Sequence, residues 1–120
     1  MQLNHLDLPV LDVRSTATFF ERFFGFHLAE MKGRDALAIL KGEGGFTFVL
    51  SPLRSDGPQE LPAELHVGFH LESEDAVRAL HAQLTAAGVE RVSPPTVRRG
   101  ALLFYCYAPG PLLVEVACRT

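Results

Sequence analysis

The stretch Glu64-Leu65-His66-Val67-Gly68-Phe69-His70-Leu71-Glu72 alternates strictly between two kinds of side chain. One parity is apolar throughout, and the other is polar or glycine. This period of two predicts a strand with an apolar face and a polar face. The polar face carries two imidazoles on either side of Gly68, and the missing side chain of glycine leaves open space beside them. We therefore expect this strand to form one wall of a site.

A second copy of this pattern opens the chain. Leu3-Asn4-His5-Leu6-Asp7-Leu8 also alternates, and its histidine corresponds to His66. In both copies the strand leads into an amphipathic stretch that ends at a glycine, which predicts a helix with a left-handed stop. Three further strand-like segments follow each helix. The chain therefore contains two copies of the order strand, helix, three strands.

The expected elements can be given by residue number. In the first copy we expect strands at 3–10, 26–31, 36–41 and 46–51, the first stopping near Pro9, with a helix that ends at Gly25. In the second copy we expect strands at 64–72, 89–92, 101–107 and 112–117, with a helix over Glu74–Ala87. Matching the two copies places Val49 on Glu115.

The predicted fold class is α+β, with two βαβββ modules that form a cupped mixed sheet covered by helices on one face. On this prediction, residues 1–120 form one domain. The first module spans residues 1–51 and the second spans 64–120, while the Pro-, Ser-, Asp- and Gly-rich segment 52–63 is a linker. The sheet faces away from the helices are expected to line a shared cavity.

Composition narrows the class of partner. Hydrophobic residues make up 48% of the chain and charged residues 21%, with a net charge of -3, as in an ordinary globular domain. Basic residues do not cluster beyond Arg98-Arg99, so we expect no nucleic-acid partner and no membrane binding. The apolar runs are far shorter than the ~20 residues of a membrane span. Cys106 and Cys118 lack the spacing of a metal site, and we expect buried, reduced thiols in a cytoplasmic protein.

Three residues stand out as a candidate metal site. His5 and His66 occupy equivalent places in the two copies, and Glu115 lies in the otherwise apolar strand Leu112–Val116. A carboxylate there is costly to bury alone, so it faces water, pairs with a cation or binds a metal. Two imidazoles and one carboxylate are the ligands of the facial triad, which leaves coordination positions open. Ordinary hydrogen bonding in a strand explains each histidine alone, and their match under the repeat is what favours the metal site.

Other polar residues are candidates for contacts around this site. His70 has the same parity as His66, and it either lines the pocket or faces solvent. Near the second hairpin lie Tyr105, Tyr107, Arg98 and Arg99. Each of these four either contacts substrate or donates a proton, or else has an ordinary packing or surface role.

The pattern resembles the vicinal oxygen chelate superfamily, which includes glyoxalase I, type I extradiol dioxygenases, fosfomycin-resistance thiol transferases and bleomycin-resistance proteins. The resemblance covers nearly the whole chain. Leu3–Val10 is similar to the family's first strand with its metal histidine, and Glu64–Phe69 is similar to the strand with the second histidine. Arg14–Phe26 is similar to the first helix and its exit, and Pro109–Val116 is similar to the closing turn and the glutamate strand.

The resemblance implies that His5, His66 and Glu115 bind a divalent metal ion (Fe²⁺, Mn²⁺, Zn²⁺ or Ni²⁺), with Glu115 also catalytic. It further implies a homodimer in which His5 of one chain faces His66 and Glu115 of the other. Two departures from the family pattern matter. Ala108–Pro111 replaces the usual Asp-Pro-Asp-Gly turn. Val49, or its neighbour Thr47, stands where glyoxalase I has a fourth ligand, which argues against glyoxalase I itself.

Two classes of function follow from the resemblance and the triad. The first is a divalent-metal-dependent enzyme that acts on a small oxygenated substrate by lyase, dioxygenase or thiol-transferase chemistry, with a developing oxyanion stabilised at the metal. The second is a metal-free protein of the bleomycin-resistance type, which binds and sequesters a small molecule such as a drug in the same cup. The complete triad favours the enzyme.

Overall fold

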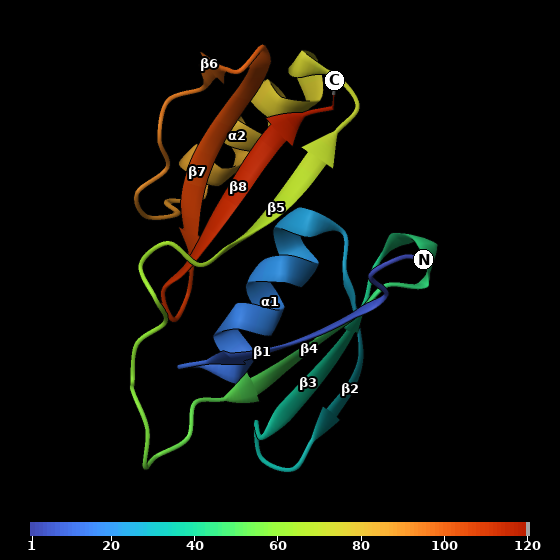
Figure 1. Ribbon diagram of the computed structural model, residues 1–120, viewed down its shortest axis with the longest axis vertical. Coiled ribbons are helices and arrows are strands. Elements are labelled where there is room, and N and C mark those ends of the chain that lie inside the picture. The colour runs from blue at the N-terminus through green and yellow to red at the C-terminus, as the bar shows by residue number, and fades with distance from the viewer. Residues whose placement is uncertain (120) are drawn as a thin grey trace. The chain divides into compact units, whose positions relative to one another are not determined.

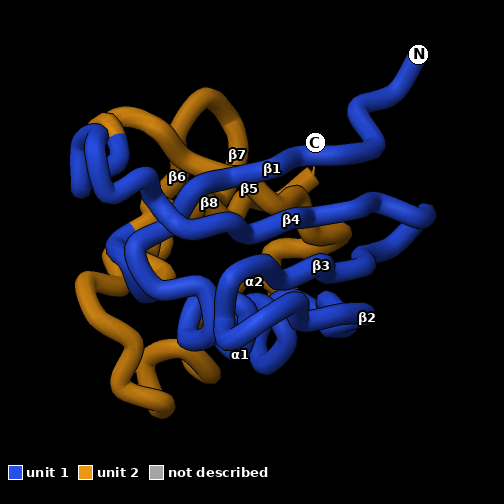
Figure 2. Tube along the Cα trace, turned by 90° about the horizontal axis from the view of Figure 1, so that it is seen from below, with its two compact units in different colours: residues 1–61, 109–111 blue, residues 62–108, 112–120 orange. Residues whose placement is uncertain are grey.

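The computed structural model describes residues 1–119, and it consists of two compact units. The first unit comprises Met1–Leu61 with Pro109–Pro111, and the second comprises Pro62–Ala108 with the chain from Leu112 onward. Figure 2 shows the first unit in blue and the second in orange. Each unit contains one four-stranded sheet and one α-helix (Figure 1). The predicted α+β fold with two βαβββ modules is confirmed.

The first unit is built around the sheet β1-β4-β3-β2, in which β1 and β4 run parallel and the other pairs antiparallel. Its elements are β1 (His5–Val10), α1 (Val13–Phe24), β2 (His27–Lys32), β3 (Leu37–Lys41), a 3₁₀ turn (Glu43–Gly45) and β4 (Thr47–Pro52). Because β1 is an edge strand, it tolerates Pro9 and ends at Val10, as predicted, although it begins at His5 instead of Leu3.

The sequence of helix α1 provides a capping residue at each end and an apolar face. The Asp12 carboxylate accepts a hydrogen bond from Ser15 N at 3.0 Å, which caps the first turn. Gly25 ends the helix in the left-handed conformation, with φ of 72°. Phe20 is fully buried, and its ring lies 5.1 Å from that of Phe48 on β4, centroid to centroid. Phe19 and Phe20 of the aromatic cluster are therefore core, whereas Phe23 and Phe24 are half-buried.

The second unit repeats the arrangement with the sheet β5-β8-β7-β6, in which β5 and β8 run parallel. Its elements are β5 (His66–Leu71), α2 (Glu74–Ala86), β6 (Thr96–Arg98), β7 (Ala101–Ala108) and β8 (Leu112–Cys118). Ser73 caps α2 by accepting a hydrogen bond from Ala76 N at 3.0 Å. Val77 and Leu84 on this helix are fully buried.

The two sheets share one register. In the first unit His5 pairs with Thr47, and Asp7 pairs with Val49. In the second unit His66 pairs with Leu113, and Gly68 pairs with Glu115. Val49 therefore holds in the first sheet the position that Glu115 holds in the second, as the alignment of the copies predicted.

The strand predicted over residues 89–92 is wrong, because the short strand lies later, at Thr96–Arg98. Val89 N donates to Leu84 O, so this residue completes the end of α2. Arg91 has φ of 54°, a left-handed conformation that a strand does not accommodate. Pro94 and Pro95 then lack the N–H groups that a ladder needs. The strand therefore begins after the prolines.

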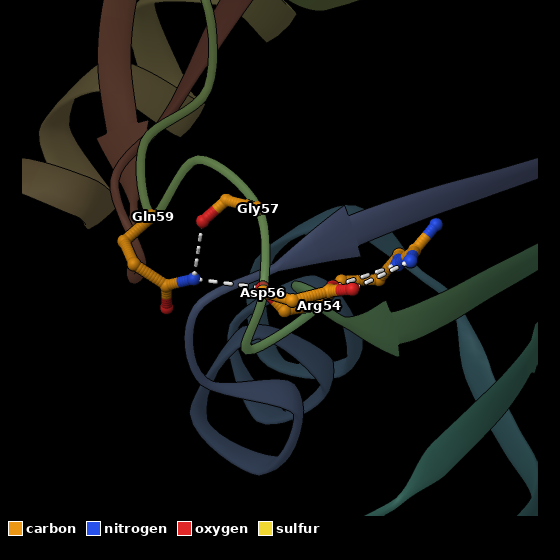
Figure 3. A network of polar contacts seen from close by, with 4 residues as sticks. All are labelled: Arg54, Asp56, Gly57 and Gln59. Atoms are coloured by element: carbon orange, nitrogen blue, oxygen red, sulfur yellow. Dashed lines mark hydrogen bonds and ion pairs between the residues drawn. The ribbon is translucent and has the colours of Figure 1, made fainter.

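The segment that follows β4 contains turns and bends and is organised by local polar contacts (Figure 3). The Arg54 guanidinium donates to both carboxylate oxygens of Asp56, at 3.0 and 2.8 Å. The Gln59 side-chain amide donates to the carbonyls of Arg54 and Gly57, at 2.8 and 3.0 Å. These exposed contacts give the segment a compact shape, although exposed ion pairs of this kind contribute little stability.

Both cysteines are free thiols. Cys106 is fully buried on β7, as predicted, whereas Cys118 at the end of β8 is only half-buried. The second position departs from the prediction because the last residue of a strand has fewer neighbours to cover it. Neither helix in the described part of the chain has the length and apolar character of a membrane span.

Candidate functional site

The β5-β8-β7-β6 sheet has one face against α2 and one open face. Along β7 the side chains alternate, so that Leu102, Phe104, Cys106 and Ala108 are buried. The other parity is half-buried, and it places Tyr105 and Tyr107 on the open face. Glu115 is paired with Tyr105 and with Gly68, so it lies on the same face. His66 and His70 on β5 share this face.

His66 is held in one tautomer by a backbone contact. Its Nδ1 lies 2.9 Å from the carbonyl oxygen of Glu64. A carbonyl oxygen can only accept, so Nδ1 must carry the proton and donate it. The lone pair is then on Nε2, which is the arrangement that histidine ligands of metals show. His66 is exposed, so this nitrogen is accessible.

Glu115 is half-buried and is not left without a partner. Its Oε1 accepts a hydrogen bond from the Tyr105 hydroxyl at 2.7 Å. Its Oε2 faces Gly68, where an added Cβ would lie 3.7 Å from this oxygen. Sequence reasoning gave water, a cation or a metal as the partners of this carboxylate. The structure adds a neutral phenol, which satisfies Oε1, while Oε2 lies next to Gly68, which has no side chain.

The hydrogen bond to Glu115 raises the pKa of Tyr105, and burial and the negative charge of the carboxylate raise it further. The positive charges of Arg98 and Arg99 oppose this shift in the pKa. A tyrosine with a raised pKa stays protonated at neutral pH, so Tyr105 remains a donor to Glu115. Arg98 and Arg99 are themselves exposed at the end of β6 and in the turn that follows.

Tyr107 has a different neighbour. The guanidinium carbon of Arg91 lies 3.8 Å from the centre of its ring, a cation–π contact. His70 is exposed, two residues beyond Gly68 on β5. Sequence reasoning missed Arg91, which it placed in a strand. It also missed the Tyr105–Glu115 contact, because a symmetric hairpin around the predicted turn at 108–111 pairs Tyr105 with Val114. The structure instead pairs Ala108 with Leu112, which brings Tyr105 opposite Glu115.

His5 lies in the first unit, at the exposed start of β1. Its sheet offers no equivalent of the Tyr105–Glu115 pair. Val49 and Ile39 hold those two positions, and Val49 is buried with 8% of its surface exposed. Asp7, next on the same face, accepts from Ser51 Oγ at 2.7 Å. Of the three predicted ligands, this unit therefore contributes His5.

The structure places His66 and Glu115 one diagonal step apart on one face of adjacent strands. Tyr105 connects them, because its ring lies 6.3 Å from the His66 ring while its hydroxyl bonds Glu115. Within residues 1–119 of a single chain, no three His, Cys, Asp or Glu side chains gather in a group that could hold a metal. The three-ligand site therefore stays a prediction, of which the second unit supplies two members.

The chain is similar to known proteins over nearly all its length. Residues 2–116 match the sequence model of the Glyoxalase/Bleomycin resistance protein/Dioxygenase superfamily. A structure described as a possible glyoxalase from Bacillus cereus is 34% identical, with a TM-score of 0.86, and the match covers 98% of this chain and 99% of that one. A comparison with curated proteins finds no match.

Two more distant structures share the fold. One is lactoylglutathione lyase from Agrobacterium tumefaciens, 18% identical with a TM-score of 0.76, where the match covers 98% of this chain and 92% of that one. The other is a mutant fosfomycin resistance protein from Listeria monocytogenes, complexed with Mn(II) and 1S,2S-dihydroxypropylphosphonic acid. It is 22% identical with a TM-score of 0.79, and the match covers 99% of this chain and 93% of that one.

Proposed function

Because the chain belongs to the glyoxalase/bleomycin resistance protein/dioxygenase superfamily, we propose that it is a divalent-metal-dependent enzyme acting on a small oxygenated substrate. The proposed ligands are His5 of one chain and His66 and Glu115 of a second chain in a homodimer. The family, the fold and the open sheet face support this proposal. The cytoplasmic location predicted from the free thiols stays a prediction.

The observation that carries the proposal is the contact between His66 Nδ1 and the carbonyl oxygen of Glu64. An exposed histidine in a strand has no need to fix its ring, yet Nδ1 of His66 is bound to Glu64 O at 2.9 Å. In the neutral ring this contact leaves the lone pair on Nε2, which can then bind a metal ion. Nε2 lies on the same sheet face as Glu115, whose Oε2 does not accept the hydrogen bond from Tyr105. A neutral imidazole nitrogen and a carboxylate oxygen are ligands that Fe²⁺, Mn²⁺, Zn²⁺ and Ni²⁺ accept. The residues of the second unit therefore fit a divalent cation.

A bound divalent ion would supply a Lewis acid that polarises substrate oxygens. The protein's own residues contribute binding and orientation. His66 and Glu115 direct their donor atoms across one sheet face, and Tyr107, held under Arg91, provides an aromatic surface on that face. His70 lies on the same face of β5, two residues beyond Gly68. Tyr105 donates to Glu115 and is therefore not free to donate to substrate in this arrangement.

Three classes of reaction are considered for this site: lyase, dioxygenase and thiol-transferase chemistry. The Listeria relative was solved with Mn(II) and a diol phosphonate, and the Agrobacterium relative is a lyase. For this chain, Val49 at the position of the fourth ligand favours a three-ligand site, and hence dioxygenase or thiol-transferase chemistry over glyoxalase I chemistry. Oxygen uptake with catechols, thiol addition to epoxides and conversion of a hemithioacetal are the three assays that separate these reactions.

Elemental analysis tests the metal site directly. Protein purified without chelator should carry stoichiometric transition metal, and His66→Ala and Glu115→Gln should each lose it. The control is His27→Ala, because His27 is exposed on β2, which is the edge strand of the first sheet on the side away from β1. Metal-free wild-type protein that does not take up any of the four cations overturns the proposal. Small-molecule binding that ignores a chelator would then favour the metal-free sequestration alternative.

A further inference from the structure

We propose that Tyr105 is a positioning residue for the metal site: its phenol fixes Glu115 so that Oε2, and not Oε1, is presented to the ion. This inference rests on the proposed function, because it concerns how one of the three proposed ligands is oriented. It assigns Tyr105 a role through Glu115 and no direct contact with the ion. Three observations carry it: the strand pairing, the anchoring of Tyr105 and the space beside Oε2.

The strand pairing brings the two side chains together. Both backbone groups of Tyr105 bond to Ser93: Tyr105 N donates to Ser93 Oγ at 2.8 Å, and Tyr105 O accepts from Ser93 N at 2.8 Å. The amide and carbonyl of Tyr105 therefore point away from β8. Tyr105 and Glu115 are thus a non-hydrogen-bonded pair of the β7–β8 ladder, the kind whose side chains lie closer together. The hydroxyl reaches Oε1 at 2.7 Å as a result.

A second set of contacts anchors Tyr105 from the helix side. Ser93 O accepts a hydrogen bond from His81 Nε2 at 3.0 Å. The His81 ring in turn packs edge-on against Phe104, with centroids 5.1 Å apart. Ser93 therefore connects α2 with the backbone of Tyr105. A tyrosine anchored in this way holds a carboxylate in place more firmly than a side chain on a free strand edge would.

The consequence concerns the mode in which Glu115 would bind. The phenol engages one carboxylate oxygen, so Oε2 is the oxygen that carries no hydrogen bond from Tyr105, and this favours monodentate coordination. Oε2 lies next to Gly68 of β5, so the available oxygen is on the side of Glu115 toward the strand that also bears His66. Residues that orient ligands in this manner affect metal affinity by roughly 10–100-fold when they are removed.

The experiment measures metal binding by the full chain with Mn(II), Zn(II) and Ni(II) alone, using calorimetric titration. Tyr105→Phe should weaken the affinity of the tightest-binding cation by roughly 10–100-fold. The matched control is Tyr107→Phe, two residues away on the same face, which should bind like the wild type. Far-UV circular dichroism checks that both variants fold. With Co(II) as the probe, the visible spectrum of Tyr105→Phe should differ from wild type, since Glu115 is free to turn.

Ser93→Ala provides a second route to the same test, since it removes the acceptor for Tyr105 N and should lower affinity in the same direction. If Glu115→Gln weakens binding while Tyr105→Phe and Ser93→Ala bind like wild type with an unchanged Co(II) spectrum, the positioning role is wrong and the metal site stands. If neither Glu115→Gln nor His66→Ala changes binding, the proposed metal site fails and the positioning role falls with it.

Discussion

Gly68 leaves no side chain between β5 and the carboxylate of Glu115. Gly68 is paired with Glu115 across β5 and β8, and its backbone does not require glycine, because its φ is not in the left-handed region. A strand residue with a side chain would ordinarily be preferred here. A Cβ at this position would lie 3.7 Å from the carboxylate oxygen, which is ordinary van der Waals contact, so only the atoms of a larger side chain would crowd Oε2.

Replacing Gly68 with valine should change metal affinity and the free energy of unfolding in different directions. In Gly68→Val the added methyl groups reach the space beside Oε2, so metal affinity should fall by tenfold or more. The free energy of unfolding in urea should stay level or rise by up to about 1 kcal/mol, because valine favours a strand. Thr96→Val on β6 is the control, at an exposed position of the same sheet. Unchanged metal affinity in Gly68→Val would show that this space is not used.

At the scale of elements, the two faces of β7 carry side chains of different burial and polarity. The parity that carries Tyr105 and Tyr107 is open, whereas Cys106 on the other parity is fully buried. Burial raises the pKa of the Cys106 thiol from 9.0 to about 11. The thiol is thus neutral and unreactive at ordinary pH, and it serves as a small apolar side chain in the core.

This pKa predicts how stability depends on pH. Above pH 9 the unfolded chain releases the Cys106 proton, while the folded chain retains it up to about pH 11. The free energy of unfolding should therefore be unaffected by this group below pH 9 and should fall between pH 9 and 11. The slope from one proton is up to about 1.4 kcal/mol per pH unit.

Urea denaturation across this pH range measures the effect. Cys106→Ala should lose that part of the slope, although the cavity lowers its stability at every pH. Val114→Ala truncates the residue paired with Cys106 on β8 without removing a thiol, so it should keep the wild-type slope. Equal slopes in Cys106→Ala and the wild type would contradict the raised pKa.

At the scale of the whole molecule, the proposed site needs two chains, since one chain supplies His5 and the other supplies His66 and Glu115. Twofold symmetry then gives a dimer two equivalent sites of this kind. Mixing variants tests this. In a dimer of one His5→Ala chain and one His66→Ala chain, one site loses both histidines and the other keeps all three ligands. Random mixing should therefore restore about a quarter of the wild-type metal sites, although each variant alone binds poorly.

The measurement is metal content after the two variants are unfolded together and refolded, with light scattering to confirm the dimer. Mixing His66→Ala with Glu115→Gln is the control, since both substitutions fall on ligands from the same chain and no intact site can form. Equal metal in the two mixtures, or none in either, would contradict a site shared between chains.

The sequence was sufficient to predict most of the elements and the faces of their strands. Alternation over Glu64–Glu72 is a local property of the chain, and it correctly placed His66, Gly68 and His70 on one face of β5. The prediction failed at residues 89–92, where apolar composition suggested a strand. There the end of α2 and the left-handed Arg91 determine the backbone, and neither follows from a period of two.

The tertiary structure decided which atoms face one another. Sequence alone predicted the repeat, the fold and three candidate ligands, because periodicity and the match between the two copies are properties of the order of residues. It could not show that Tyr105 donates to Glu115 or that the Glu64 carbonyl fixes the tautomer of His66. The first contact depends on the register between two strands, and the second depends on the rotamer of a side chain. Both are set only when the chain folds and its residues acquire their neighbours.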